Sequence, residues 1–404
     1  MWTLTARWIV PVDGSPQANG TVTLDGERIA AVEPHGVCRP DIDLGDAAIL
    51  PGLVNTHTHL DLSGARGRTP PSTDFVGWLR QVIAYRRSRT PEEVREDIRA
   101  GLTECVRHGT TLVGDISGDG SSWDILKEAP LQAVVFRELL GLTEERAEAA
   151  LTAARGWLAA HPDTEMCRAG LSPHAPYSIR SSLFAQAALL ARSPKHPLAV
   201  HLAESREELE LLHQRRGPFV AFLREFGGWD PNGLSDSPAA VMKICDQRIP
   251  KLFVHGNYLA PNTRIPRGGT IVYCPRTHAA FGHPPHPFRE FLARGKRVAL
   301  GTDSLASNPD LDILAEARFL HRHYPDISGA ALLRMATLAG AEALGWDKET
   351  GSLAPGNSAD LVVIALPAAA GDPHELILNS TEPVRAVLCR GRWVHGAAEI
   401  GTVS

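Results

Sequence analysis

Short apolar runs alternate with longer amphipathic stretches through the middle of the chain. Eight runs are bounded by polar or turn-forming residues: 50–56, 111–116, 133–140, 167–172, 198–201, 252–255, 270–274 and 298–301. Helical patterns lie between them, among them 91–107, 144–160, 205–226 and 329–344. Because strands that alternate with helices pair in parallel, this pattern predicts an α/β fold. Eight units favour a (β/α)8 TIM-type barrel over the alternative, an open doubly wound sheet.

The two ends of the chain have a different pattern. Residues 1–50 and 351–404 carry short segments rich in β-branched residues, separated by turn signals such as Asp25-Gly26. We expect them to form one small β-sandwich domain, and residues 51–350 to form the barrel. A chain of 404 residues has room for both.

Composition narrows the functional class. The formal net charge is only -5 and no basic stripe is present, which argues against a nucleic-acid partner. No apolar run reaches the ~18 residues of a membrane span, and the first residues lack the pattern of a signal peptide. The six cysteines are scattered without a C-x-x-C, so a disulfide framework is not expected. We therefore expect a cytoplasmic protein that acts on a small molecule, with no membrane partner.

Polar residues stand where several apolar runs end. His57 and His59 are two residues apart and would face the same side of a strand. His201, His255 and Asp303 end later runs, and active sites of parallel barrels form at the carboxyl ends of the strands. Imidazole suits zinc or iron. The pattern predicts an open, catalytic metal site made of three histidines and an aspartate, with a further histidine and a glutamate beside it.

Each of these residues also has an ordinary interpretation. Glu204, three residues after His201, can shuttle a proton beside a metal-bound water, or can simply be a charge at a helix N-terminus. His255 can be a buried histidine with a polar partner, and Asp303 can cap the next helix. We base the metal hypothesis on the fact that such residues occur at the ends of several predicted strands, and not on any single residue.

The same motifs resemble those of the amidohydrolase superfamily. They are Pro51-Gly52-Leu53-Val54-Asn55-Thr56-His57-Thr58-His59, His201-x-x-Glu204, His255, Gly301-Thr302-Asp303-Ser304 and the closing segment 351–363. The resemblance implies His57, His59, His201 and Asp303 as ligands of a metal that is usually zinc and sometimes iron. It implies Glu204 as the proton shuttle, His255 as the group that positions the water or the leaving group, and a homodimer.

The number of metal ions follows from one missing residue. Two-metal members of the superfamily carry a carbamylated lysine on the fourth barrel strand, and the fourth apolar run here, 167–172, has no lysine. One divalent metal ion is therefore expected.

Two further segments resemble one branch of the superfamily. Residues 172–178 and Trp78-Leu79 are similar to deaminases of adenosine-like nucleosides, including those of methylthioadenosine and S-adenosylhomocysteine. Residues 75–83 with Arg86-Arg87 are closer to the aminodeoxyfutalosine deaminases of menaquinone synthesis. The resemblance implies loss of an exocyclic amine as ammonia, with His174 on a ribose hydroxyl. Trp78 would wall the substrate pocket or, alternatively, pack in the core.

The chain also departs from its relatives. Its seventh run ends in Cys274-Pro275-Arg276-Thr277-His278, where a serine-asparagine pair is more usual, and no ribose-gripping glutamate follows shortly after Trp78. We expect His278 to contact the substrate. His283 and His286 would be further contacts, a second metal trap or part of a rigid loop.

The remaining alternatives concern one loop residue and the reaction. Ser307 would face the substrate, or be a solvated serine or helix cap. Other reactions on the same scaffold are guanine or pterin deamination, triazine dechlorination and cyclic-amide hydrolysis. An inactive binding scaffold is a further alternative.

Overall fold

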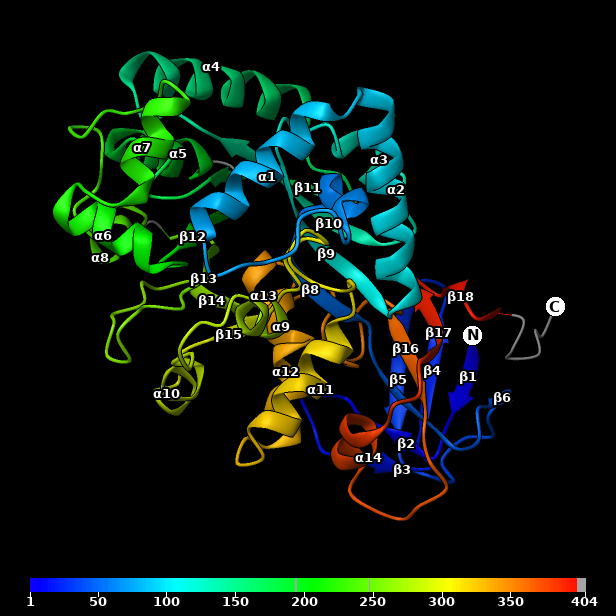
Figure 1. The fold of residues 1–404 in the computed structure, drawn as a ribbon. Coiled ribbons are helices and arrows are strands. Elements are labelled where there is room, and N and C mark those ends of the chain that lie inside the picture. Colours follow the sequence, from blue (N-terminus) through cyan, green and yellow to red (C-terminus); the bar gives the residue numbers. More distant parts are fainter. Residues whose placement is uncertain (193–194, 247, 398–404) are drawn as a thin grey trace.

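Eight parallel strands curl into a nearly closed barrel at the centre of the molecule (Figure 1). The computed structural model describes residues 1–192, 195–246 and 248–397. Barrel strands that are neighbours in the chain are neighbours in the sheet and pair in parallel. They are β8 (Leu53–Thr58), β9 (Thr110–Ser117), β10 (Gln132–Leu139), β11 (Cys167–Pro173), β12 (Leu198–Leu202), β13 (Lys251–His255), β14 (Gly269–Tyr273) and β15 (Val298–Leu300). Each lies on one of the eight apolar runs, so the predicted barrel is confirmed.

Helices occupy most connections between these strands and pack on the outside of the barrel (Figure 1). They are η1 (Leu60–Ala65), α1 (Phe75–Ser88), α2 (Pro91–Arg107), α3 (Trp123–Leu126), α4 (Glu144–Ala160), α5 (Ser181–Ala191), α6 (Arg206–Gln214), α7 (Pro218–Glu225), α8 (Pro238–Ile244), α9 (Pro275–Ala280), α10 (Phe288–Ala293), α11 (Ile313–His323), α12 (Gly329–Met335) and α13 (Leu338–Leu344).

Two predicted helices are confirmed to the residue and two are divided. The helix α2 begins after a capping box in which Thr90 and Glu93 satisfy each other's backbone N–H groups. The predicted helix 205–226 is broken between α6 and α7 because Arg215 and Gly217 have positive φ and Pro218 starts the next helix. The predicted helix 329–344 is interrupted where Thr337 leaves the helical conformation.

Both chain termini contribute to a second core beside the barrel, where blue and red strands lie together in Figure 1. One sheet has the order β5-β4-β1-β6 and the other β18-β17-β16-β7-β2-β3. The strands are β1 (Trp2–Thr5), β2 (Trp8–Ile9), β3 (Gln17–Ala18), β4 (Thr21–Asp25), β5 (Arg28–Glu33), β6 (Ile42–Asp43), β7 (Ala47–Pro51), β16 (Leu361–Ala365), β17 (Val384–Cys389) and β18 (Arg392–His395), with one helix, α14 (Pro373–Asn379). Leu4, Ile49 and Val363 are among the residues of the shared core. The predicted sandwich is confirmed, and residues 398–404 lie outside the described part.

The apolar run 50–56 belongs to two sheets rather than to one strand. It is divided at Gly52, after which the chain passes from β7 of the small domain to β8 of the barrel. A side chain at Gly52 would place its Cβ only 1.9 Å from Thr111 Oγ1, so the crossing passes too close to β9 for any other residue.

The barrel is closed between β8 and β15 by a few specific hydrogen bonds. The carbonyl of His57 accepts from the backbone N–H groups of Thr302 (3.1 Å) and Asp303 (3.0 Å). Asn55 Nδ2 donates to Thr302 Oγ1 (2.8 Å), while Asn55 Oδ1 accepts from the Thr302 N–H (3.2 Å). A Cβ at Gly301 would lie 2.8 Å from the His57 Cβ, so only glycine permits this approach. These contacts bring the ends of the first and last barrel strands together.

No helix in the described part of the chain combines the length and the apolar character needed to cross a membrane.

Asn55→Ala should destabilise the protein because it leaves buried partners of the Asn55 amide unsatisfied. We expect a loss of about 2–3 kcal/mol in the free energy of unfolding, measured by denaturant titration. Asn379→Ala, at an exposed position of α14, is the matched control and should change it by less than about 0.5 kcal/mol. Equal stability of the two variants would show that Asn55 does not hold the closure.

Candidate active site

Five predicted site residues converge at the carboxyl ends of the barrel strands. One nitrogen or oxygen from each of His57, His59 and Asp303 lies within 4.8 Å of the others, and so do nitrogens of His57, His201 and His255. All five side chains are buried. His57 ends β8, His201 lies in β12 and His255 ends β13, so residues as much as 246 positions apart in the sequence meet at one point (303 minus 57). The structure thus brings together the residues that the sequence pattern singled out.

The donor atoms are arranged as metal ligands would be. Asp303 Oδ1 lies 3.4 Å from His57 Nε2 and 3.6 Å from His59 Nε2, and the Nε2 atoms of His59 and His201 are 3.3 Å apart. Both ring nitrogens of His57 are buried without a hydrogen-bond partner, which is costly unless another group binds them. His201 Nδ1 donates to the backbone carbonyl of His174 (3.1 Å), which leaves the lone pair of Nε2 facing the cluster. The residues present therefore fit a divalent metal ion.

Electrostatics keep the cluster in the protonation states that ligands need. Burial by itself would raise the pKa of Asp303, but the neighbouring imidazoles, His57 first, hold that pKa well below its ordinary value. Burial lowers the pKa of both His59 and His201 well below the usual histidine value. A carboxylate and neutral imidazoles are the forms that bind metals.

One cluster accounts for every candidate metal group in the described residues. Every set of three or more histidine, cysteine or acidic side chains close enough to share an ion belongs to it. His278, His283 and His286 form no such set, so within those residues the predicted alternative of a second metal trap has no support. Strand β11, where a bridging lysine would be sought, reads CRAGLSP.

Glu204 lies beside the cluster, and hydrogen bonds from neighbouring residues to its backbone hold it in place. Its Oε1 lies 3.3 Å from His255 Nε2, and burial, with the negative charges of Asp303 and Glu208, raises its pKa well above the ordinary value. Glu208, one turn along α6, accepts from the N–H groups of Ala203 (2.8 Å) and Glu204 (3.0 Å). Asn257 Nδ2 donates to the Glu204 carbonyl (2.9 Å). Glu204 is therefore fixed in place, and its raised pKa favours the protonated form.

Two of these residues have a left-handed backbone conformation. His255 has φ +68° and Asp303 has φ +62°, which is unfavourable for side chains other than glycine and is common at functional sites. His286 Nε2 donates to the His255 carbonyl (2.7 Å), and Thr58 Oγ1 donates to the Asp303 carbonyl (3.2 Å). The surroundings hold both residues in this conformation.

A cavity of about 550 Å³ opens above the cluster. His59, His201, Glu204, His255 and Asp303 are among the residues that line it. Its lining also includes the apolar Leu79, Ile83, Leu140, Phe222 and Phe226 and the charged Arg87 and Arg146. A cavity of this volume takes a ligand of nucleoside size.

Trp78 and His174 both line this cavity, as expected for substrate contacts. Trp78 also packs against Phe75 and Phe281, and its Nε1 donates to the Thr69 carbonyl (3.0 Å). It therefore belongs both to the core and to the cavity wall. Burial lowers the pKa of His174 to about 3, so the imidazole is neutral.

Neither His278 nor Ser307, both predicted substrate contacts, is among the residues that line the cavity. His278 is buried away from the cavity; its Nε2 donates to the Pro284 carbonyl (2.9 Å) and its Nδ1 lies 3.0 Å from Asn257 Oδ1. Ser307 Oγ donates to Asp303 Oδ2 (2.7 Å). Both side chains are therefore engaged with neighbouring residues of the site. Ser304, rather than Ser307, lines the cavity.

Two charged residues of the cavity wall were not predicted as site residues from the sequence. They are Glu138 at the end of β10 and Arg86 in α1. Arg86 Nη2 lies 3.2 Å from Asp61 Oδ2, and its Nη1 lies 3.5 Å from Glu138 Oε2. One available signal was the spacing of Trp78, Val82 and Arg86, which places all three on one face of a helix. Glu138 closes an apolar strand at the same level as the other site residues, and that position alone could have identified it.

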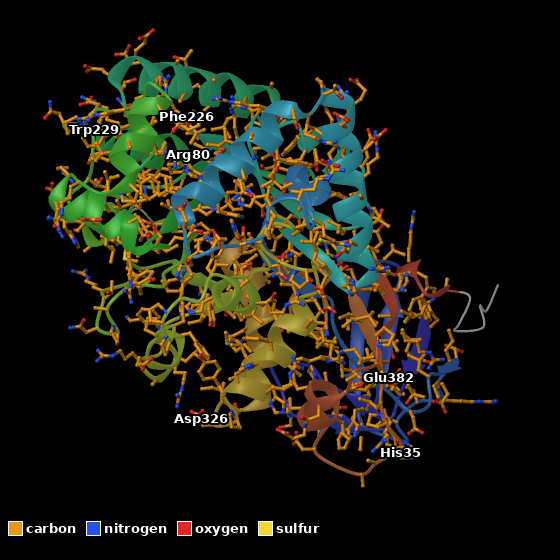
Figure 2. All side chains as sticks on the ribbon, viewed as in Figure 1. His35, Arg80, Phe226, Trp229, Asp326 and Glu382 are labelled. Atoms are coloured by element: carbon orange, nitrogen blue, oxygen red, sulfur yellow. The ribbon has the colours of Figure 1, made fainter. Side chains whose placement is uncertain are left out.

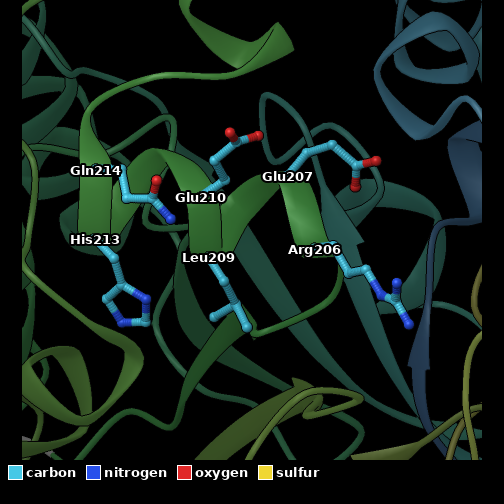
Figure 3. Close-up of a pocket in the computed structure, with 6 residues that line it drawn as sticks. All are labelled: Arg206, Glu207, Leu209, Glu210, His213 and Gln214. Carbon is cyan, nitrogen blue, oxygen red and sulfur yellow. The ribbon is translucent and has the colours of Figure 1, made fainter.

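A shallow hollow of about 350 Å³ on the outer surface has a different character (Figure 3). All six lining residues, Arg206 to Gln214, come from the single helix α6, so the hollow does not enclose a ligand. The candidate catalytic residues line the barrel cavity and not this hollow.

The barrel with its histidine and aspartate cluster defines the class of protein, a (β/α)8 barrel with a candidate metal centre at its carboxyl end. Residues 48–394 match the model of the amidohydrolase family, and the chain belongs to that family.

Similar proteins agree with this assignment. A 5-methylthioadenosine/S-adenosylhomocysteine deaminase of Moorella thermoacetica is 30% identical over 95% of this chain and 89% of its own length. An aminodeoxyfutalosine deaminase of Nitratiruptor sp. is 28% identical over 85% of this chain and 86% of its own. The crystal structure of Helicobacter pylori aminofutalosine deaminase in complex with methylthio-coformycin superposes with a TM-score of 0.85, covering 98% of this chain and all of that chain at 22% identity.

Metal analysis of the purified protein should find about one equivalent of divalent metal per chain. His57→Ala should bring this close to zero, because it removes a central donor of the cluster. His35→Ala, an exposed histidine of the small domain (Figure 2), is the control and should retain the full equivalent. Two equivalents in the unaltered protein would contradict the single-metal prediction.

Proposed function

We propose that this protein is a metal-dependent aminohydrolase that removes the exocyclic amine of an adenine-type nucleoside and releases ammonia. The observation that carries the proposal is the buried Glu204, with its raised pKa, which lies beside the ligand cluster and lines a cavity of nucleoside size. Hydrolysis of an amidine needs a group that protonates the ring nitrogen while the neighbouring carbon is attacked. The names of the similar deaminases support the same reaction class.

We infer that His57, His59, His201 and Asp303 hold one divalent ion, zinc in preference to iron, because imidazole and carboxylate ligands suit zinc. When bound, such an ion acidifies water to a pKa of about 7 and supplies the nucleophile.

The protein's own residues divide the proton transfers between them. Asp303 accepts the proton of the attacking water at its carboxylate, since its low pKa keeps it ionised in the resting site. Glu204 donates its proton to the ring nitrogen, which allows the ring to accept electrons. His255, 3.3 Å from Glu204, lies where its Nε2 can orient the attacking water and stabilise the oxygen that adds to the ring. Proton transfer to the amine then releases ammonia.

The substrate candidates are 6-amino-6-deoxyfutalosine, methylthioadenosine and S-adenosylhomocysteine. All three carry a group beyond the sugar, and the apolar side chains and arginines of the cavity lining offer contacts for it. The role in menaquinone synthesis, the homodimer and the cytoplasmic location expected from the sequence remain predictions.

An ammonia-release assay tests the substrate class directly. We expect turnover of at least one of the three candidates or of adenosine, and no turnover of guanine, pterins or chlorinated triazines above the metal-free control. Release of chloride from a triazine, or of ammonia from guanine alone, would replace the nucleoside proposal with another reaction of the same scaffold.

Glu204→Gln should retain the metal and lose turnover by about 10²–10⁴-fold, because glutamine has the same shape but no transferable proton. Glu207→Gln, in the surface hollow on α6, is the matched control and should keep the activity of the unaltered protein. The measurements are steady-state ammonia release and metal content. Full activity of Glu204→Gln would refute the role given to this residue.

A further inference from the structure

Three polar residues of the cavity wall form a polar belt next to the metal cluster. It is made of Arg86 from α1, Glu138 from the end of β10 and His174 from the loop after β11, and all three line the cavity. The belt borders the cluster directly. Arg86 Nη2 lies 3.4 Å from His59 Nδ1, and the His174 carbonyl accepts from the His201 N–H (2.8 Å).

Glu138 offers an acceptor that nothing in the described protein uses. Its side chain is 3% exposed, and its Oε1 is buried without a hydrogen-bond partner. The other carboxylate oxygen, Oε2, faces Arg86 Nη1 at 3.5 Å. An unsatisfied buried acceptor costs about 1–3 kcal/mol, so a ligand that donates to it gains in affinity.

His174 Nε2 is a second hydrogen-bond acceptor, and it lies close to Glu138 Oε1. Ser178 Oγ donates its hydrogen to the Ala175 carbonyl (3.1 Å), so it accepts from His174 Nδ1 (2.7 Å). In the neutral ring this leaves a lone pair on Nε2. That atom lies 3.8 Å from Glu138 Oε1, too far for a hydrogen bond between them.

Two neighbouring acceptors require a ligand with two neighbouring donors. A cationic ligand is disfavoured because the guanidinium of Arg86 lies beside Glu138. Two adjacent hydroxyl groups provide the donors without charge, as the 2′ and 3′ hydroxyls of a ribose do.

We propose that Glu138 and His174 together bind the vicinal diol of the substrate's sugar, and that Glu138 is the residue that makes the site selective for ribonucleosides over deoxynucleosides. This subsite rests on the proposed deamination of an adenine-type nucleoside. It adds Glu138, from the third barrel strand, to the residues that determine specificity. Arg86, held between Asp61 and Glu138, positions the carboxylate.

The test compares the deamination of adenosine, 2′-deoxyadenosine and 3′-deoxyadenosine. For the unaltered protein we expect kcat/KM to fall about 10²-fold on loss of either hydroxyl, because a site built to bind a hydroxyl discriminates strongly against its absence. In Glu138→Gln, kcat/KM for adenosine should fall about 10–100-fold. The penalty for at least one deoxynucleoside should shrink below about 5-fold.

Glu148→Gln, at an exposed position of α4, provides the matched control. It makes the same chemical change away from the cavity-lining residues, so the ratio of adenosine to deoxynucleoside kcat/KM should stay near that of the unaltered protein. Metal content and circular dichroism establish that each variant is folded.

The possible outcomes separate this inference from the proposed function. Equal kcat/KM for adenosine and both deoxynucleosides in the unaltered protein, which needs no variant, overturns the diol subsite and leaves nucleoside deamination standing. An undiminished penalty in folded Glu138→Gln overturns the role of Glu138. Absence of ammonia release from every nucleoside overturns the proposed function and the subsite together.

Discussion

The site depends on closure of the barrel between its first and last strands. β8 carries His57 with His59 directly after it, and the segment after β15 carries Asp303, yet no strand ladder joins β8 to β15. The junction is made by the His57 carbonyl and the side chain of Asn55, which bind the backbone of Thr302 and Asp303. The same hydrogen bonds therefore close the fold and set the distance between the histidine pair and the aspartate. A metal ion bound there would strengthen the same junction.

Burial and neighbouring charges shift the pKa values of Asp303 and Glu204 in opposite directions. The central side chains are buried, so their pKa values depend more on their neighbours than on bulk solvent. The imidazoles around Asp303 lower the pKa of its carboxyl group, whereas burial and the negative charges of Asp303 and Glu208 raise the pKa of Glu204. The pKa values of two carboxyl groups in one cavity are thus pushed apart, which suits one to accept and the other to donate a proton.

A second layer of residues fixes these groups in place. Glu208 binds the backbone of the Glu204 loop, His286 binds the carbonyl of His255, and Ser307 binds Asp303. The left-handed conformations of His255 and Asp303 persist because these contacts hold them. The cluster is thereby built on the barrel strands and the residues that directly follow them, while the rest of the cavity lining comes from α1, α7, β10 and the loops.

The sequence by itself determined the barrel, the small domain formed from both ends, and the candidate ligand set, because strand periodicity and residues at strand ends are local properties. Helix α2 has the predicted bounds because its start is encoded locally, by the capping box at Thr90. Tertiary structure decided what depends on distant segments. It divided the run 50–56 at Gly52 because β9 lies too close, turned His278 and Ser307 into supports, and set Glu138 opposite His174. Which polar residue faces a cavity is decided by the packing of several elements, and no single stretch of sequence contains that information.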